Sequence, residues 1–244
     1  MGDKREQDTP FSVQAQLALD LQQKRHFSAE RFIAGGSNAS ARAWLARPQW
    51  PEGRLWLWGP AGTGKTHLLH IWAAEQEAIL CEASALSCAP DGALRVGQQI
   101  LEASAAPLAI DHIERVGSEV ALLHLLNRAH AAGQRVLMAS RHPPARGDFA
   151  LPDLASRLRA TVTAGLEEPE DNVRATLLLS LLAERQLVVP QSVTEWLWRR
   201  LPRTGEALVQ AVQRLDEAAM AQGSAISRSL AMNVLKDLLK DEHL

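Results

Sequence analysis

The segment Gly59-Pro-Ala-Gly-Thr-Gly-Lys-Thr66 constrains the fold of this chain more than any other feature. It matches the pattern G-x-x-x-x-G-K-[ST], in which glycines let successive backbone N–H groups converge and a helix begins directly behind them. A bulky apolar run at 55–58 precedes the segment and indicates a strand, while residues 66–75 have the pattern of a helix. This strand–turn–helix context predicts a phosphate-binding loop, and makes a glycine-rich turn that binds nothing the weaker interpretation.

Two residues of the loop have a specific chemical role in such sites. Lys65 is expected to reach the β- and γ-phosphates of a nucleotide, and the hydroxyl of Thr66 to bind Mg²⁺. A second metal-binding group is expected at Asp111, which ends the apolar run 108–110 as the acid of a Walker B strand does, although alone such an Asp more often caps a helix. The predicted ligands are ADP or ATP with Mg²⁺, bound by Gly59, Pro60, Ala61, Gly62, Thr63, Gly64, Lys65, Thr66 and Asp111.

Apolar runs alternate with helical patterns along the first two thirds of the chain. Strands are expected at 55–58, 78–81, 108–110, 135–139 and 161–163, and helices at 66–75, 94–103 and 120–129. This alternation indicates an α/β fold with a parallel sheet covered on both faces. Beyond Glu170 the apolar residues recur at helical spacing in 173–187, 193–201, 207–220 and 230–239. The chain therefore divides into a flexible arm over 1–25, a nucleotide-binding α/β domain over 26–168 and a helical lid domain over 169–244.

Composition argues against several classes of protein. The 244 residues carry 26 Lys and Arg against 28 Asp and Glu, a net charge of −2, which disfavours strong direct binding to DNA through charge. No apolar stretch approaches the ~20 residues of a membrane span, and the first residues lack an apolar signal core, so a cytoplasmic protein without membrane contact is expected. Cys81 and Cys88 fit buried hydrophobic positions better than a disulfide or a zinc site.

Several segments resemble the DnaA-related AAA+ family, and its truncated, Hda-like members most. They are residues 27–38, 64–70, 108–111 and 151–158. The resemblance runs from about residue 27 to 240 and ends where the initiators continue into a DNA-binding helix-turn-helix domain. It implies an AAA+ fold with a helical lid, and a nucleotide site that includes Phe32 and Ile33 near the adenine and His67 behind the loop. It also implies that Arg157 is an arginine finger pointing into a neighbouring subunit's site; a surface arginine is the alternative.

The arm contains a second resemblance. The segment Gln16-Leu-Ala-Leu-Asp-Leu21 is similar to the peptide by which Hda-like proteins bind the sliding clamp of DNA polymerase III. A glutamine can form hydrogen bonds in one subsite while leucines fill an apolar pocket, from a segment that is extended when free. Without the family context, a six-residue motif of this kind would more often be a chance helix fragment. The residues expected to contact the clamp are Gln16, Leu17, Leu19 and Leu21.

Three positions depart from the family pattern in the parts used for hydrolysis. His112 stands where family members have a second acid, Arg141 where they have an Asp, and Glu206 where they have the sensor 2 arginine. A neutral imidazole is a poorer electrostatic match for orienting water, and a carboxylate at 206 repels a γ-phosphate. Glu114 and Arg203 are the nearest candidates to replace the missing acid and the missing arginine.

Three functional hypotheses follow. The first is a regulator of replication initiation that binds ADP or ATP, is tethered to the clamp, and presents Arg157 to ATP-bound DnaA to stimulate its ATP hydrolysis. Such a protein has weak or no intrinsic ATPase and is compatible with a homo-oligomer. The second is a self-sufficient AAA+ ATPase of the loader or remodelling type, and the third is a structural module with a relic loop. The intact loop together with the altered hydrolytic positions favours the first.

Overall fold

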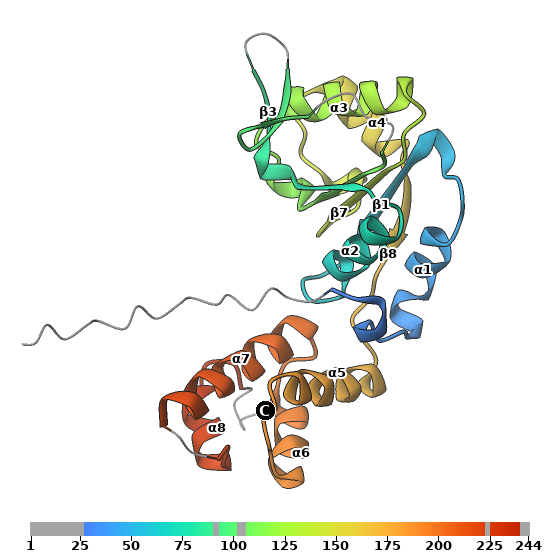
Figure 1. Ribbon diagram of the computed structural model, residues 1–244. Helices are drawn as coiled ribbons and strands as arrows, with labels where there is room; N and C mark the ends of the chain where they lie inside the picture. The colour runs from blue at the N-terminus through green and yellow to red at the C-terminus, as the bar shows by residue number, and fades with distance from the viewer. Residues whose placement is uncertain (1–26, 90–92, 102–105, 223–224, 240–244) are drawn as a thin grey trace, which may run out of the picture.

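The computed structural model describes residues 27–89, 93–101, 106–222 and 225–239 (Figure 1). The proposed clamp-binding segment 16–21 lies outside these residues. A five-stranded sheet forms the centre of the α/β part, in the order β2-β6-β7-β1-β8, and all its paired strands are parallel. Its strands are β1 (Arg54–Trp58), β2 (Ile79–Glu82), β6 (Leu108–Asp111), β7 (Val136–Ser140) and β8 (Val162–Gly165). The five strands expected from the sequence are confirmed to within one or two residues.

Helices cover both faces of this sheet, as predicted. Side chains alternate along β1, so that Leu55 and Leu57 enter one core while Trp56 enters the other. The first core lies under α1 and α2, and the second under α3 and α4 (Figure 1). Each fully buried side chain of this size stabilises the fold by about 1.5–3 kcal/mol. The helices are α1 (Ala39–Leu45), α2 (Lys65–Glu75), α3 (Glu119–Ala131) and α4 (Pro152–Arg159).

The prediction of a helix at 94–103 is wrong. Residues Leu94–Val96 form β4 and Gln99–Ile100 form β5, and both join β3 (Leu86–Cys88) in a small antiparallel sheet. Val96 pairs with Gln99, so only two residues connect β4 to β5, and Gly97 has the positive φ of 61° that such tight hairpins favour. Leu94 and Leu101 enter the core that also contains α3. The hairpin turn therefore overrides a spacing that also fits a helix.

Short 3₁₀ turns connect the main elements. They are η1 (Ala29–Arg31), η2 (Gly36–Asn38), η3 (Pro51–Gly53), η4 (Ala83–Ala85), η5 (Ile113–Arg115) and η6 (Pro144–Arg146). Both cysteines are free, and burial raises the pKa of the Cys81 thiol to about 12. The expectation that Cys81 acts as a small buried hydrophobic residue is therefore confirmed.

Four further helices have a core of their own. They are α5 (Asp171–Glu184), α6 (Gln191–Arg200), α7 (Gly205–Gln222) and α8 (Arg228–Val234), and Leu178, Leu197, Leu208 and Leu215 are among the side chains packed between them. Figure 1 shows these helices as a bundle on one side of the sheet. Glu170, just before α5, accepts hydrogen bonds from the backbone nitrogen (2.9 Å) and the hydroxyl (3.3 Å) of Ser37, and so ties the bundle to the segment ahead of α1.

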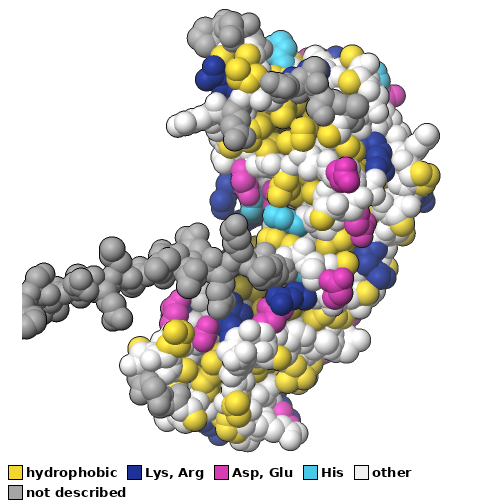
Figure 2. All heavy atoms as spheres, viewed as in Figure 1, with side chains coloured by type: hydrophobic (Ala, Val, Ile, Leu, Met, Phe, Trp, Pro, Cys, Tyr) yellow, Lys and Arg dark blue, Asp and Glu magenta, His cyan; other side chains and the backbone are white. Residues whose placement is uncertain are grey.

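Charges are mixed on the outside of the molecule. On the face shown in Figure 2, Lys and Arg side chains lie among Asp and Glu side chains, and neither sign dominates. This agrees with the net charge of −2. Within the described residues, every helix is too short or too polar to span a lipid bilayer.

Candidate functional site

The loop from Gly59 to Gly64 connects β1 to α2 and is tightly enclosed. Gly62 has a φ of 76°, and a Cβ atom built on it would lie 2.0 Å from the backbone nitrogen of Glu206 at the start of α7. Gly64, the residue before α2, has a φ of 95°. Glycine adopts this left-handed region without the strain that a side chain causes. The two glycines therefore allow the loop both to turn and to pack directly against the C-terminal bundle.

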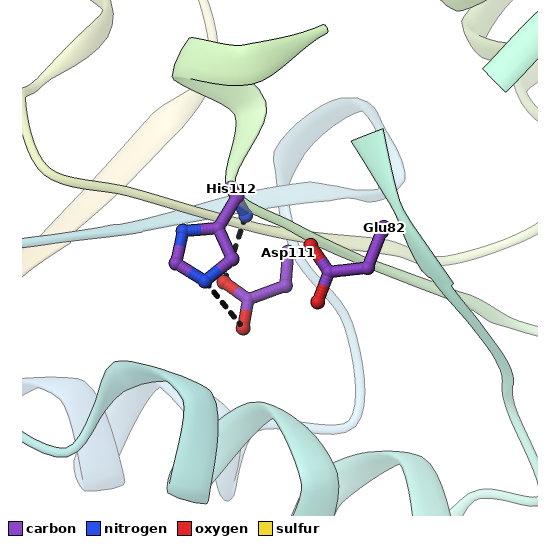
Figure 3. A group of neighbouring side chains, drawn as sticks. All are labelled: Glu82, Asp111 and His112. Atoms are coloured by element: carbon purple, nitrogen blue, oxygen red, sulfur yellow. Dashed lines mark hydrogen bonds and ion pairs between the residues drawn. The ribbon is translucent and has the colours of Figure 1, made fainter. Parts of the chain in front are cut away.

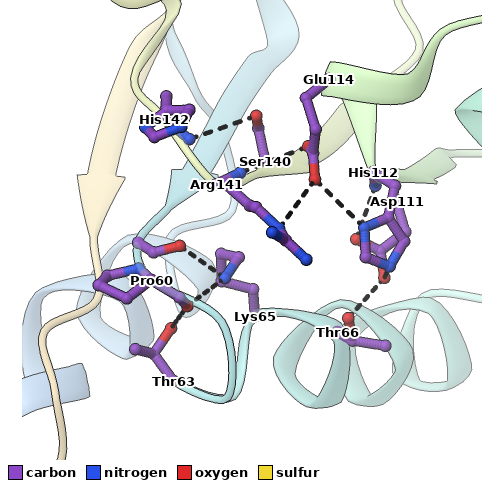
Figure 4. Close-up of polar contacts among 11 residues, drawn as sticks. Pro60, Thr63, Lys65, Thr66, Asp111, His112, Glu114, Ser140, Arg141 and His142 are labelled. Carbon is purple, nitrogen blue, oxygen red and sulfur yellow. Dashed lines mark hydrogen bonds and ion pairs between the residues drawn. The ribbon is translucent and has the colours of Figure 1, made fainter. Parts of the chain in front are cut away.

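Lys65 lies inside this loop. Its ammonium group donates hydrogen bonds to the carbonyl oxygens of Gly59 (2.7 Å) and Pro60 (2.6 Å), and the residue is only 8 % exposed (Figure 4). Burial lowers the pKa of Lys65, and the negative charges of Asp111 and Glu114 partly oppose this effect. A buried ammonium held by neutral carbonyls is well placed to exchange them for an anionic oxygen, which is the stronger acceptor.

Thr66 and Asp111 meet as the sequence predicts. The Thr66 hydroxyl donates a 2.6 Å hydrogen bond to Oδ2 of Asp111, which is 45 residues further along the chain. Asp111 ends β6 and is 3 % exposed, and its other oxygen accepts a 2.8 Å bond from the backbone nitrogen of His112. A hydroxyl and a carboxylate in contact are oxygen ligands of the kind that Mg²⁺ prefers, so these residues fit the expected ion.

Glu82 is a further carboxylate at this point that the sequence reasoning missed. It ends β2, directly opposite Asp111 in the strand register, and Figure 3 shows its carboxylate turned toward that of Asp111. Candidate ligand atoms of Glu82, Asp111 and His112 all lie within 4.8 Å of one another. An acidic residue just past the predicted strand 78–81 was the available signal, because the carboxyl ends of neighbouring parallel strands meet at one edge of a sheet.

Two of the three altered positions form a network around Glu114. His112 has a left-handed backbone (φ 54°, ψ 49°), and its Nδ1 lies 3.3 Å from Oε1 of Glu114. The Arg141 backbone nitrogen donates a 3.4 Å bond to Oε2 of Glu114, and the guanidinium Nε lies 3.8 Å from Oε1. Figure 4 shows that guanidinium reaching toward the start of α2. The Glu114 carboxylate is therefore held between His112 and Arg141, beyond the carboxyl end of β6.

The charge state of Glu114 follows from these contacts. Burial works against its ionised form, but hydrogen bonds from its own backbone N–H, from the Ser140 hydroxyl and from His112 outweigh burial and lower its pKa. The left-handed backbone of His112 costs on the order of 1–2 kcal/mol, which is the kind of strain found at functional sites. The result is an ionised carboxylate held close to Asp111 and Lys65.

The segment 27–33 lies against the start of α2. A Cβ atom on Gly64 would lie 3.1 Å from the Phe32 ring, which in turn packs edge-on against His67 at 5.2 Å. Nε2 of His67 lies 2.8 Å from the Ser28 carbonyl oxygen, and burial lowers the pKa of the imidazole. The Ile33 carbonyl accepts a 3.0 Å hydrogen bond from the Asn38 amide. Phe32 and His67 thus lie next to the loop. The contact of these two residues and of Ile33 with an adenine stays a prediction.

Arg157 lies away from the loop of its own chain. On α4, its Nε is 3.2 Å from Oδ1 of Asp153, and its side chain is 36 % exposed. Its positive charge contributes, after the larger effect of burial, to lowering the pKa of Arg54. Arg54 begins β1, whereas the loop follows the other end of that strand, about 13 Å further on at 3.3 Å per residue. The structure therefore places Arg157 away from the phosphate loop of its own chain.

The two candidate sensor 2 residues differ in position. Glu206 is in the first turn of α7, and its backbone lies against Gly62 of the loop; its carboxylate also raises the pKa of Lys65 slightly against the effect of burial. Arg203 forms an ion pair with Asp171 at 3.5 Å within the C-terminal bundle. Replacement of the missing arginine by Arg203 is therefore not supported, and the charge next to the loop is that of a carboxylate.

Comparison with known proteins shows what this chain is similar to. No protein-family model matches the chain. It is 30 % identical over 252 aligned residues to the chromosomal replication initiator protein DnaA of Sphingopyxis alaskensis, across 94 % of this chain and 55 % of the initiator. Over nearly its whole length the chain is therefore similar to DnaA. It spans about half the length of the initiator that it matches.

Solved structures of DnaA share the fold of this DnaA-like protein. Domain III of Thermotoga maritima DnaA superposes with a TM-score of 0.71 at 20 % identity, across 89 % of this chain and 98 % of that domain. AMPPCP-bound DnaA from Aquifex aeolicus gives a TM-score of 0.58 at 18 % identity, across 82 % of this chain and 68 % of the other. The AAA+ fold expected from the sequence is confirmed, and the chain is similar to DnaA as the sequence led us to expect.

Proposed function

We propose that this DnaA-like protein is an Hda-type regulator of replication initiation, which binds a nucleotide and stimulates ATP hydrolysis by DnaA. The observation that carries the proposal is the separation of Arg157 from the loop of its own chain. An arginine that cannot reach its own nucleotide is available to a nucleotide bound by another subunit, where such a residue raises hydrolysis by ~10³–10⁵ in the best-studied GTPases.

The nucleotide is ADP or ATP with Mg²⁺. The A. aeolicus DnaA of the same fold binds AMPPCP, and the groups that would contact such a ligand are present here. Lys65 would bind the phosphates, while Thr66 and Asp111 would hold the ion, with Glu82 next to them. Mg²⁺ supplies charge neutralisation of the phosphate oxygens when bound. Phe32, Ile33 and His67 would border the adenine side.

Hydrolysis by the chain alone is weak under this proposal. Phosphoryl transfer depends on positioned charge around the γ-phosphate and the attacking water. Here a carboxylate, Glu206, lies at the edge of the loop, and His112 takes the place of an acid. Binding can therefore persist where cis hydrolysis is slow.

The partners under this proposal are DnaA and the sliding clamp of DNA polymerase III. The clamp would bind Gln16, Leu17, Leu19 and Leu21 in the arm, and so place Arg157 near DnaA at newly replicated DNA. Self-association of the chain is compatible with the same exposed Arg157.

The test is stimulation of the DnaA ATPase in the presence of DNA-loaded clamp. Arg157→Ala should abolish the stimulation while nucleotide and clamp binding remain. The side chain lies away from the loop of its own chain, and the proposed clamp contacts are in the arm. Arg159→Ala is the matched control, since it removes the same charge two residues along α4, and it should retain the stimulation. Alanine at Gln16, Leu19 and Leu21 together should abolish clamp binding and leave nucleotide binding unchanged.

One observation favours the alternative of a self-sufficient ATPase. Glu114 is held as an ionised carboxylate close to Asp111 and could orient water in place of His112. Brisk ATP turnover by the isolated chain, or full stimulation of DnaA by Arg157→Ala, would establish that alternative instead.

A further inference from the structure

The C-terminal bundle contains a positively charged pocket that the proposed function does not use. The pocket has a volume of about 240 Å³ and is lined by Asp171, Arg174, Trp198, Arg199, Leu201 and Arg203. Three arginines thus line one cavity. Asp171 is the only carboxylate among the described residues that line it, so the lining carries an excess of positive charge.

Arg174 is the fixed charge of this pocket. Its side chain is only 3 % exposed, and it lies 3.1 Å from Oδ1 of Asp171. Its other terminal nitrogen donates to the carbonyl oxygens of Leu201 (3.4 Å) and Pro202 (3.3 Å). Its Nε is buried and has no hydrogen-bond partner within the described part of the chain. A buried charge is costly unless it is fully paired, and this one is not.

The carboxylate that pairs with Arg174 also pairs with a second arginine. Asp171 is about half exposed and is shared between Arg174 and Arg203, whose Nη2 lies 3.5 Å from its other oxygen. The indole N–H of Trp198 is a further buried donor without an acceptor among the described residues. Arg199, in the last turn of α6, is the third arginine of the lining. Among the described residues that line the pocket, arginines therefore outnumber carboxylates by three to one.

We propose that this pocket binds a phosphate group. Guanidinium groups form paired, charge-assisted hydrogen bonds to phosphate oxygens, and an anion would complete the pairing that Asp171 alone leaves unfinished. The phosphate can belong to a small free anion or to the backbone of a single-stranded nucleic acid. None of the described residues that line the pocket belongs to the loop at 59–66, so the proposal does not depend on the nucleotide-binding function.

The test is calorimetric titration of the full chain with inorganic phosphate and, separately, with an oligothymidylate. Arg199→Ala and Arg203→Ala together should weaken binding by at least about tenfold, because each removes a charge-assisted contact. Arg200→Ala is the matched control: it removes the same charge at the end of α6, but its guanidinium lies over the ring of Trp196, 5.8 Å from the ring centroid, and it does not line the pocket. It should bind like the wild type.

Two further variants distinguish phosphate bound in this pocket from phosphate bound elsewhere on the chain. Lys65→Ala should leave phosphate binding at this pocket unchanged. That result would show that the phosphate is not bound at the nucleotide loop. Asp171→Asn should tighten binding, because it removes the carboxylate that competes with the anion for Arg174 and Arg203. Binding of phosphate alone would identify a free anion, and binding of the oligothymidylate would identify a nucleic-acid backbone. Binding of neither probe by the wild type, or equal affinities in the double variant and Arg200→Ala, would overturn the proposal.

Discussion

Replacement of Lys65 by alanine tests the nucleotide site most directly. In the structure, its ammonium group donates to two loop carbonyls at 2.7 and 2.6 Å. Nucleotide binding exchanges these neutral acceptors for phosphate oxygens, so the net gain is that of a charge-assisted hydrogen bond, about 1.5–3 kcal/mol. One factor of ten in affinity corresponds to about 1.4 kcal/mol, and the variant should therefore bind ADP or ATP roughly ten- to a hundredfold more weakly.

The measurement is calorimetric titration of wild type and variant with ADP and with ATP in the presence of Mg²⁺. Lys236→Ala is the matched control, because it removes the same charge from an exposed position after α8 and should bind like the wild type. Thermal unfolding without nucleotide establishes that the Lys65 variant is folded. An affinity that is unchanged in a folded Lys65→Ala protein would refute the assignment of the loop as the nucleotide site.

Two other side chains at the site give testable effects. Glu206→Gln should raise the affinity for ATP relative to ADP several-fold, because it removes a negative charge next to the loop. The control is Glu217→Gln, which removes a carboxylate with the same i,i+4 glutamine contact on α7 and should leave this ratio unchanged. Competition titration with ATP and ADP measures the ratio for both variants. Glu114→Gln should lower the melting temperature at pH 7. Because the pKa of folded Glu114 lies below its ordinary 4.5, its stabilising effect is present above that value, and the difference between variant and wild type should vanish as the pH falls through the lowered pKa.

Features that depend on local sequence could be predicted. The strands of the parallel sheet are short apolar runs with breakers on both sides, and the phosphate loop determines its own backbone through its glycines. The meeting of Thr66 with Asp111 also followed, because the end of an apolar strand and the start of the helix after the loop lie at the same edge of the sheet. The hairpin at 94–101 could not be predicted in this way, since its apolar spacing fits a helix as well as strands. Pairing of β4 with β3 and β5 decides that this segment forms strands.

Side-chain partners across the fold were beyond the reach of sequence alone. Glu82 stands just past an expected strand, but its place directly opposite Asp111 depends on β2 and β6 lying side by side. Arg203 is close to Glu206 in sequence and on that basis could replace the missing arginine. Its ion pair with Asp171, 32 positions earlier, holds it beside the start of α5 instead. Such contacts depend on how elements distant in the sequence pack together, and a local sequence pattern does not determine this.

The altered positions around the loop are connected physically. His112 and Arg141 both contact Glu114, so replacing an acid by His112 and an Asp by Arg141 leaves one ionised carboxylate held between two nitrogen donors. A lone Arg at position 141 would add positive charge near Lys65, and a lone Glu114 would add negative charge near Asp111. Paired, the two charges largely cancel, so the loop keeps the electrostatic conditions for binding phosphate. Glu206 adds a negative charge on the side where the C-terminal bundle meets Gly62. Under the proposed function, binding and hydrolysis are therefore affected differently. Nucleotide binding would rest on the loop and Asp111, whereas hydrolysis would meet the Glu206 carboxylate where the bundle packs against the loop.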